Sequence, residues 1–251
     1  MTVSAERFEG HVRWLARNGY KGICPADWLR WRNEGKGLPE KPILFTFDDA
    51  YEDLAKYALP VLRRYDFGAA VYVVTGQLGG TNAWDEARGY SALRLMTADQ
   101  IRYWASLGIE FGAHSRTHAD LTGLSPQELS EEVVGSGQDL EALLGAKVVS
   151  FAYPYGFHNQ AVDDCVRGAF DLAFIADDRN EGMNHLQTDP HLLLRTMIQS
   201  NDSVLALRFR ARWGYNPFLE LKTRVDDLRS RVALRTRLRR ALHSAASRAK
   251  L

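Results

Sequence analysis

Residues 43–49 read ILFTFDD, a short run rich in β-branched and aromatic residues that ends in two adjacent aspartates. Five further runs of this kind follow along the chain, and several are apolar on both faces, which is typical of strands covered on both sides of a sheet. The six strands predicted in this way are 43–48, 70–75, 109–114, 148–153, 172–176 and 192–198.

Helical patterns separate these strands. Ser4 is a candidate N-cap for a helix through residue 17, and Ser125 begins a longer helix that ends before Gly145. The other predicted helices are 25–31, 53–65 (interrupted or reshaped near Pro60), 97–107 and 159–169. The alternation of strand and helix predicts an α/β fold with a parallel sheet or barrel. Residues 78–94 are predicted to form a surface loop, which in such folds often overhangs a site.

The composition is that of an ordinary globular protein. The 251 residues are 45% hydrophobic and 25% charged, which excludes disordered, fibrous and disulfide-stapled classes. We find no phosphate-binding glycine loop, no apolar run of membrane-spanning length and no apolar stretch near the N-terminus. Cys24 and Cys165 are isolated and are predicted to be reduced, so the expected location is the cytoplasm.

Charge is distributed unevenly along the chain. Residues 221–251 hold ten Lys/Arg and two Asp, a net charge of +8, and because the whole chain carries +1, residues 1–220 carry −7. We therefore expect a barrel domain over 1–218 and a basic amphipathic helix over 219–251. That helix could bind an anionic membrane surface, at the inner face of the membrane, or a protein partner. It could equally pack against the barrel with its arginines in solvent; nothing in the body supports nucleic-acid binding.

Polar side chains follow three of the predicted strands. Asp48 and Asp49 end the first, His114 and His118 follow the third, and a Tyr-Pro-Tyr-Gly turn follows the fourth. Carboxyl ends of parallel strands meet at one edge, so we expect these groups to converge. The two imidazoles and one of the two aspartates form a three-ligand set for a divalent metal, and the other aspartate can take a proton from water. A helical turn over 115–118 would put both imidazoles on one side.

The strings FTFDDAYED, HSRTHADL and FAYPYG, in this order, resemble the first three motifs of the polysaccharide deacetylase family, also called carbohydrate esterase family four, in its FAYPYG-type branch. The resemblance covers about residues 1–200. It implies a distorted (β/α) barrel with about seven parallel strands, an enzyme that removes N- or O-acetyl groups from glycans, and a bound divalent metal. The metal is commonly Zn²⁺, with Co²⁺ or Ni²⁺ as alternatives.

The resemblance also assigns roles to single residues. Asp48 would be the general base, and Tyr155 would offer its main-chain N–H to the oxyanion. The metal ligands would be Asp49, His114 and His118. Two positions depart from the family pattern: Ala50 replaces a glycine, and Arg195, placed in the last predicted strand, would replace the usual arginine that contacts the base.

A general acid is the third departure, because the late Leu-x-His motif of the family is missing. His185 is our first candidate to protonate the leaving amine, ahead of His191 and His158. A role in sugar stacking was considered for Trp84, Tyr90, Tyr153 and Trp213, although packing in the core or in loops is favoured for each alone.

These expectations together describe a metal-dependent deacetylase that acts on the N-acetyl group of an acetylated sugar, glycan or glycolipid, with Asp48 as general base. Two alternatives stay open at the level of sequence. One is an amidohydrolase of a non-sugar amide, which the same site could hydrolyse. The other is a catalytically weakened glycan-binding module of the same fold, which the missing general acid would favour.

Overall fold

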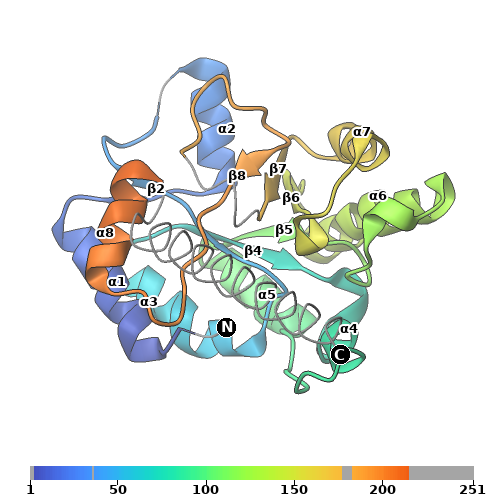
Figure 1. The fold of residues 1–251 in the computed structure, drawn as a ribbon, viewed down its shortest axis with the longest axis horizontal. Helices are drawn as coiled ribbons and strands as arrows, with labels where there is room; N and C mark the ends of the chain where they lie inside the picture. Colours follow the sequence, from blue (N-terminus) through green and yellow to red (C-terminus); the bar gives the residue numbers. More distant parts are fainter. Residues whose placement is uncertain (1–2, 36, 177–182, 215–251) are drawn as a thin grey trace, which may run out of the picture.

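Six short parallel strands form the central sheet, in the order in which they occur along the chain (Figure 1). The computed structural model describes residues 3–35, 37–176 and 183–214. The strands are β3 Phe45–Phe47, β4 Ala69–Val73, β5 Glu110–Ala113, β6 Ser150–Ala152, β7 Leu172–Ile175 and β8 Leu193–Leu194. All six predicted strands are confirmed, and each is shorter than the sequence pattern suggests.

A small two-stranded parallel sheet continues this architecture. It pairs β1 (Lys21–Gly22) with β2 (Pro42–Ile43), and only Leu44 separates β2 from β3. One stretch of chain, β2 with β3, therefore joins both sheets. Counted with this stretch as one, seven stretches from β1 to β8 form the distorted (β/α) barrel with about seven parallel strands that the family resemblance implies.

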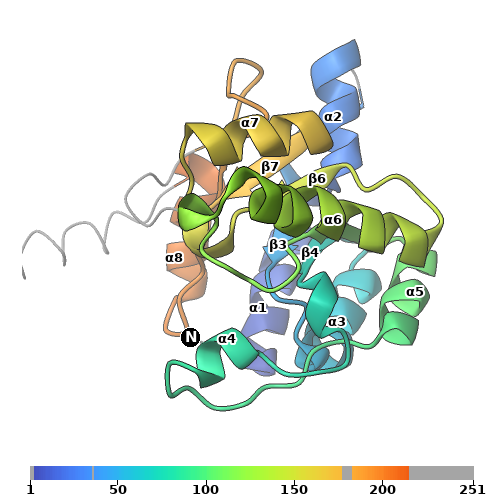
Figure 2. The ribbon, with the colours of Figure 1, turned by 90° about the vertical axis from the view of Figure 1, so that its right-hand side faces the viewer.

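Helices cover the outside of the sheet (Figure 2). α6 packs on β5, and α7 packs on α6. The helices are α1 Ala5–Arg17, α2 Pro25–Glu34, α3 Leu59–Arg64, α4 Ala83–Glu86, α5 Ala98–Ser106, α6 Pro126–Leu144, α7 Gln160–Ala169 and α8 Val204–Trp213. None of the described helices is both long enough and apolar enough to span a bilayer.

Local capping signals explain where several helices begin and end. Ser4 accepts a hydrogen bond from the Arg7 N–H at the start of α1. Ser125 and Glu128 form a reciprocal capping box at the start of α6, which ends at Gly145 in the left-handed conformation, with φ of 67°. These helix ends are where the sequence places them.

The segment predicted as one reshaped helix over 53–65 divides in two. Leu54–Ala58 forms a π-helical turn (η1), and α3 continues from Leu59. Pro60 lacks the N–H that a regular α-helix would use to bond the residue four positions earlier. This explains the change of helix type near Pro60.

Alternation along the strands divides the core into two layers. Val71, Phe111 and Phe151 face the helices and join the main apolar cluster. Tyr72 and Phe174 face the barrel interior, within a second cluster, and their rings lie 5.8 Å apart. Every residue of β4 is buried, as expected for a strand that is covered on both sides.

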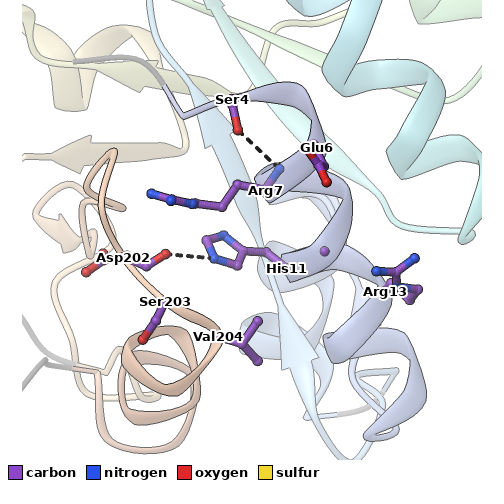
Figure 3. Close-up of a pocket in the computed structure, with 9 residues that line it drawn as sticks. Ser4, Glu6, Arg7, His11, Arg13, Asp202, Ser203 and Val204 are labelled. Carbon is purple, nitrogen blue, oxygen red and sulfur yellow. Dashed lines mark hydrogen bonds between the residues drawn. The ribbon is translucent and has the colours of Figure 1, made fainter.

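α8 was not among the predicted helices. Ser203 caps its N-terminus and Gly214 ends it. It packs against α1, where the His11 Nε2 lies 3.1 Å from the Asp202 carbonyl oxygen beside a hollow of about 380 Å³ (Figure 3). The predicted domain boundary at residues 218 and 219 and the basic helix over 219–251 lie outside the described residues.

Candidate metal centre

Side chains from four loops converge at the carboxyl edge of the sheet. The loops after β3, β5, β6 and β8 supply the groups that meet there. The residues brought together are Asp48, Asp49, His114, His118, Tyr155 and Arg195. Parallel strands place their carboxyl ends at one edge, which is why residues far apart in the sequence share this site.

Asp49, His114 and His118 form the centre of the cluster. The Asp49 Oδ1 lies 3.6 Å from the Nε2 of His114 and 3.3 Å from the Nε2 of His118. One candidate ligand atom from each of the three residues lies within 4.8 Å of the other two. Among the described residues, the buried Asp49 Oδ1 has no hydrogen-bond partner. An oxygen with no partner beside two imidazole nitrogens is an arrangement that fits a cation.

The electrostatics agree with this fit. Burial raises the pKa of Asp49 to about 6, and the adjacent Asp48 carboxylate adds to the rise. Burial lowers the pKa of His118 to about 3, so its imidazole is neutral near pH 7. A neutral His118 imidazole and a carboxylate that repels its neighbour are donors that a divalent cation stabilises.

The two imidazoles reach this position without the helical turn that the sequence analysis expected over 115–118. Ser115 and His118 are both left-handed, each with φ of 61°, and the Ser115 Oγ accepts a hydrogen bond from the His118 N–H at 2.9 Å. That expectation was wrong because Ser115 and His118 lie outside the right-handed region that a turn of α-helix requires.

Backbone strain is concentrated at this edge. Six described non-glycine residues have positive φ, and five of them lie in the loops of the site. These five are Asp49, Ala50, Ser115, His118 and Tyr155. Ala50, the residue that replaces the family glycine, has φ of 53° and is buried, so its Cβ is tolerated at a conformational cost. Clustered strain of this kind is typical of functional sites.

Asp48 is held by a bidentate ion pair. The Arg195 Nη1 and Nη2 lie 2.6 and 2.9 Å from its two carboxylate oxygens. Burial alone would raise the pKa of Asp48, but the charge and hydrogen bonds of Arg195, together with His114 and His118, outweigh burial and lower the pKa to about 2. Arg195 directly follows β8 rather than lying inside a strand, and its guanidinium lies 5.7 Å from the centre of the Tyr72 ring.

Tyr155 closes the cluster from the loop after β6. It lies in the short turn Pro154–Gly156 with φ of 59°, and its ring meets the edge of the His118 ring at 4.4 Å. Within the described parts of the chain its main-chain N–H makes no hydrogen bond. A free N–H next to the ligand group is available to a substrate oxygen.

Within the described residues, the three candidate general acids make their hydrogen bonds outside this cluster. The His185 main chain bonds to Thr188 in the loop before β8, and no hydrogen bond or ion pair joins its imidazole to the site within residues 3–35, 37–176 and 183–214. The His191 Nε2 lies 2.9 Å from the carbonyl oxygen of Phe170, the residue after α7. His158 pairs with Asp163, which is on α7, at 3.1 Å.

The predicted surface loop over 78–94 does overhang the site, and it contains the short helix α4. The Trp84 ring stacks on the His118 ring at 4.6 Å, and the Arg88 guanidinium lies 4.5 Å over the Tyr155 ring. From the sequence, Trp84 is a candidate for sugar stacking, with packing in the core or in a loop favoured; the contact with His118 is not predicted. Of the other aromatic candidates, Tyr153 is buried in the core, and Trp213 stacks on Phe209.

Comparison with known proteins identifies the family to which this fold and site belong. The family model described as "Polysaccharide deacetylase" matches residues 35–169, more than half of the chain. The chain is 27% identical over 170 residues to a poly-beta-1,6-N-acetyl-D-glucosamine N-deacetylase of Staphylococcus aureus (strain MSSA476), a match that covers 63% of this chain and 55% of that protein. The chain spans about half the length of the curated relatives it matches.

Two solved structures show the same fold. The Streptococcus pyogenes deacetylase PplD, solved in complex with acetate, superposes with a TM-score of 0.71 at 26% identity and covers 82% of this chain and 86% of its own. IcaB from Ammonifex degensii also has a TM-score of 0.71, at 22% identity over 85% of this chain and 90% of its own. With the family model matched over most of the barrel, this chain belongs to the polysaccharide deacetylase family.

Proposed function

We propose that this protein is a metal-dependent deacetylase that hydrolyses the N-acetyl group of an acetylated sugar within a glycan or glycolipid. The observation that carries the proposal is the pairing of two unlike groups at one edge of the sheet. One is the ligand group Asp49, His114 and His118, and the other is the separate carboxylate of Asp48, held ionised by Arg195. Hydrolysis of an amide by water needs both an electrophilic centre and a base.

The proposed metal is Zn²⁺, because two imidazoles and one carboxylate with a position left open are typical of catalytic zinc. The ligands would be Asp49, His114 and His118. Bound there, the cation supplies a Lewis acid that polarises the acetyl carbonyl and makes a neighbouring water more acidic. Co²⁺ and Ni²⁺ accept the same donors and are the alternatives.

The remaining steps belong to the protein's own groups. Asp48 accepts a proton from the attacking water, and Arg195 keeps its two oxygens in a fixed plane. The Tyr155 N–H donates to the oxygen that becomes negative as the carbonyl carbon turns tetrahedral. The C–N bond then breaks, which releases acetate and leaves a free amine on the sugar once the nitrogen has gained a proton. His185 as the donor of that proton stays a prediction.

The relatives guide the choice of substrate. The Staphylococcus aureus relative is named for an N-acetylglucosamine polymer, and the Streptococcus pyogenes deacetylase was solved with acetate, which is the second product of this reaction. We therefore propose N-acetylhexosamine in a glycan as the substrate class. The cytoplasmic location and a membrane or protein partner for residues 219–251 stay predictions from the sequence.

The decisive experiment is Asp48→Asn. The exchange removes the base and keeps the shape of the side chain, so acetate release from N-acetylglucosamine oligomers should fall about 10²- to 10⁴-fold. Bound zinc, measured by elemental analysis, should stay at the parent level because the three ligands are intact. The matched control is Asp99→Asn, since Asp99 is almost fully exposed on α5.

Three results would overturn the proposal or its parts. If Asp48→Asn released acetate as fast as the parent, Asp48 would not be the base. Zinc and oligomer binding without acetate release from any sugar would identify a glycan-binding module. Release from non-sugar amides alone would identify a different amidohydrolase.

A further inference from the structure

The two histidines of the metal group are oriented in different ways. The His114 Nδ1 lies 2.7 Å from the Ala152 carbonyl oxygen on β6, which fixes the ring and directs Nε2 towards Asp49. The His118 Nδ1 is buried and has no hydrogen-bond partner on any other described residue. Histidines that bind metals almost always have a partner for the second ring nitrogen, because that partner fixes ring orientation. Something else must hold His118.

Aromatic contacts enclose the His118 ring instead. Trp84 stacks on one face, with ring centres 4.6 Å apart and planes 16° from parallel. Tyr155 meets it edge-on at 4.4 Å and 85°, and His114 meets it at 4.8 Å and 76°. A ring stacked in this way loses the freedom to rotate about χ2, which a hydrogen bond would otherwise restrict.

Trp84 is itself held in place by the loop around α4. Asn82, only 1% exposed, accepts a hydrogen bond from the Leu93 N–H at 2.6 Å and donates to Asp85 at 3.2 Å. Asp85 in turn accepts from the Tyr51 hydroxyl, two residues after Asp49, at 3.4 Å. The loop is thereby tied at both ends and to the first loop of the site, so the indole is positioned before any ligand arrives.

We propose that Trp84 is a positioning residue for His118: its stacked indole fixes the ring plane in which Nε2 faces Asp49, in place of the missing hydrogen bond at Nδ1. Trp84 contacts the imidazole and not the reacting atoms. The inference rests on the metal site under the proposed function, and it adds a residue outside the three sequence motifs. Loss of the indole should therefore lower metal affinity by about 10- to 100-fold, the range for residues that orient a ligand.

The test compares Trp84→Ala with Trp84→Phe. Zn²⁺ affinity is measured by competition with a chromogenic chelator, and the Co²⁺-loaded proteins are compared by their visible absorption spectra. We expect Trp84→Ala to bind Zn²⁺ about 10- to 100-fold more weakly and to change the Co²⁺ spectrum. Trp84→Phe should restore both towards the parent, because a phenyl ring can stack on His118. Trp31→Ala, on α2, is the control for loss of a half-buried indole away from the site.

Fluorescence gives a second measurement, which tests whether Trp84 lies beside the bound metal. Co²⁺ at the ligand group should quench the Trp84 indole most strongly of the six tryptophans, since its ring stacks on a ligand. The quenched fraction should therefore fall in Trp84→Phe although Co²⁺ still binds.

The outcomes separate the two proposals. A parent protein that binds no Zn²⁺ would overturn the proposed metal site, and this inference with it. A parent that binds Zn²⁺ with the same affinity and Co²⁺ spectrum as a folded Trp84→Ala variant would overturn the role of Trp84 alone. If Trp84→Ala did not fold, a folded Trp84→Phe protein with the Co²⁺ quenching of the parent would equally contradict it.

Discussion

The carboxyl edge of the sheet and the surrounding layer of helices differ in which residues adopt the left-handed backbone conformation. At helix ends, left-handed conformations fall mainly on glycines, such as Gly35, Gly145 and Gly214, with Asp66 after α3 as an exception. At the edge they fall on residues that carry a Cβ, including Asp49 and His118. The helices therefore follow the backbone preferences of their residue types, whereas the loops at the carboxyl edge do not.

The difference shows where the fold tolerates an unfavourable conformational free energy. Each left-handed residue with a Cβ costs on the order of 1–2 kcal/mol, and the edge holds five of them together with a largely buried ion pair. The well-capped helices and the buried strands supply the stability that offsets this. The site is therefore a strained surface held by a regular scaffold, and substitutions in the two regions should differ in kind.

The largest effect is expected from Arg195→Met, which breaks the pair at the edge. The Asp48 carboxylate would then lack its partner, and the free energy of unfolding should fall by about 3 kcal/mol. This is the lower end of the range for breaking a buried ion pair, because a third of the Asp48 side chain is exposed. Urea denaturation measures the loss, and acetate release should fall with it. Equal stability in variant and parent would show that loss of the Arg195–Asp48 pair leaves no unfavourable buried charge at the edge.

The next effect concerns the opposite end of the same sheet. Glu110 begins β5 and accepts a hydrogen bond from the Ala26 N–H at 3.1 Å, and burial raises its pKa to about 7. The unfolded carboxyl has a pKa near 4.5, so the folded state binds the proton more tightly and stability is lost as pH rises from about 4.5 to 7.

Glu110→Gln removes this titration and keeps an acceptor for Ala26. Above pH 7 the variant should be more stable than the parent by up to about 3 kcal/mol, and below pH 4.5 the two should be alike. Thermal unfolding at a series of pH values measures the difference. Parallel pH profiles for the two proteins would contradict the assignment, and unchanged acetate release would separate this end of the sheet from the site.

Ser125→Ala tests the helical layer. It removes the capping box with Glu128 at the start of α6, and unfolding free energy should fall by about 1 kcal/mol. Zinc content and acetate release should stay at parent values, because the capping bonds join Ser125 to Glu128 and not to a ligand residue. A change in metal content would mean that the two regions are coupled.

Ala50→Gly should have the smallest effect. Glycine adopts the left-handed conformation of residue 50 without the Cβ penalty, but it also makes the unfolded chain more flexible and removes a buried methyl group. We expect a net gain below about 1 kcal/mol in unfolding free energy. A loss of more than that would show that the Ala50 methyl group is part of the packing at the edge.

The contrast also explains which features could be predicted from the sequence. Strands were visible as apolar runs, and helix ends at Ser4 and Ser125 were visible as caps, because both signals are local. α8 has the same kind of capping residues, Ser203 before it and Gly214 after it, so this helix too is predictable from local sequence.

At the site, the sequence indicated the groups but not how the backbone presents them. The spacing of His114 and His118 suggested a helical turn, whereas two left-handed residues make the reversal. The stack of Trp84 on His118 joins residues 34 positions apart, and no local pattern records such a contact. The same holds for Arg195 and Asp48, whose pairing was expected only from the family resemblance.

That last pair has a consequence for how the protein is made. Asp48 follows the first strand of the central sheet and Arg195 follows the last, 147 positions later. While the chain grows on the ribosome, the strands up to β7 can pair in order, each with the one before it. Asp48 acquires its counter-charge only when residue 195 has emerged, so the pair at the carboxyl edge can form only after synthesis has passed the final strand.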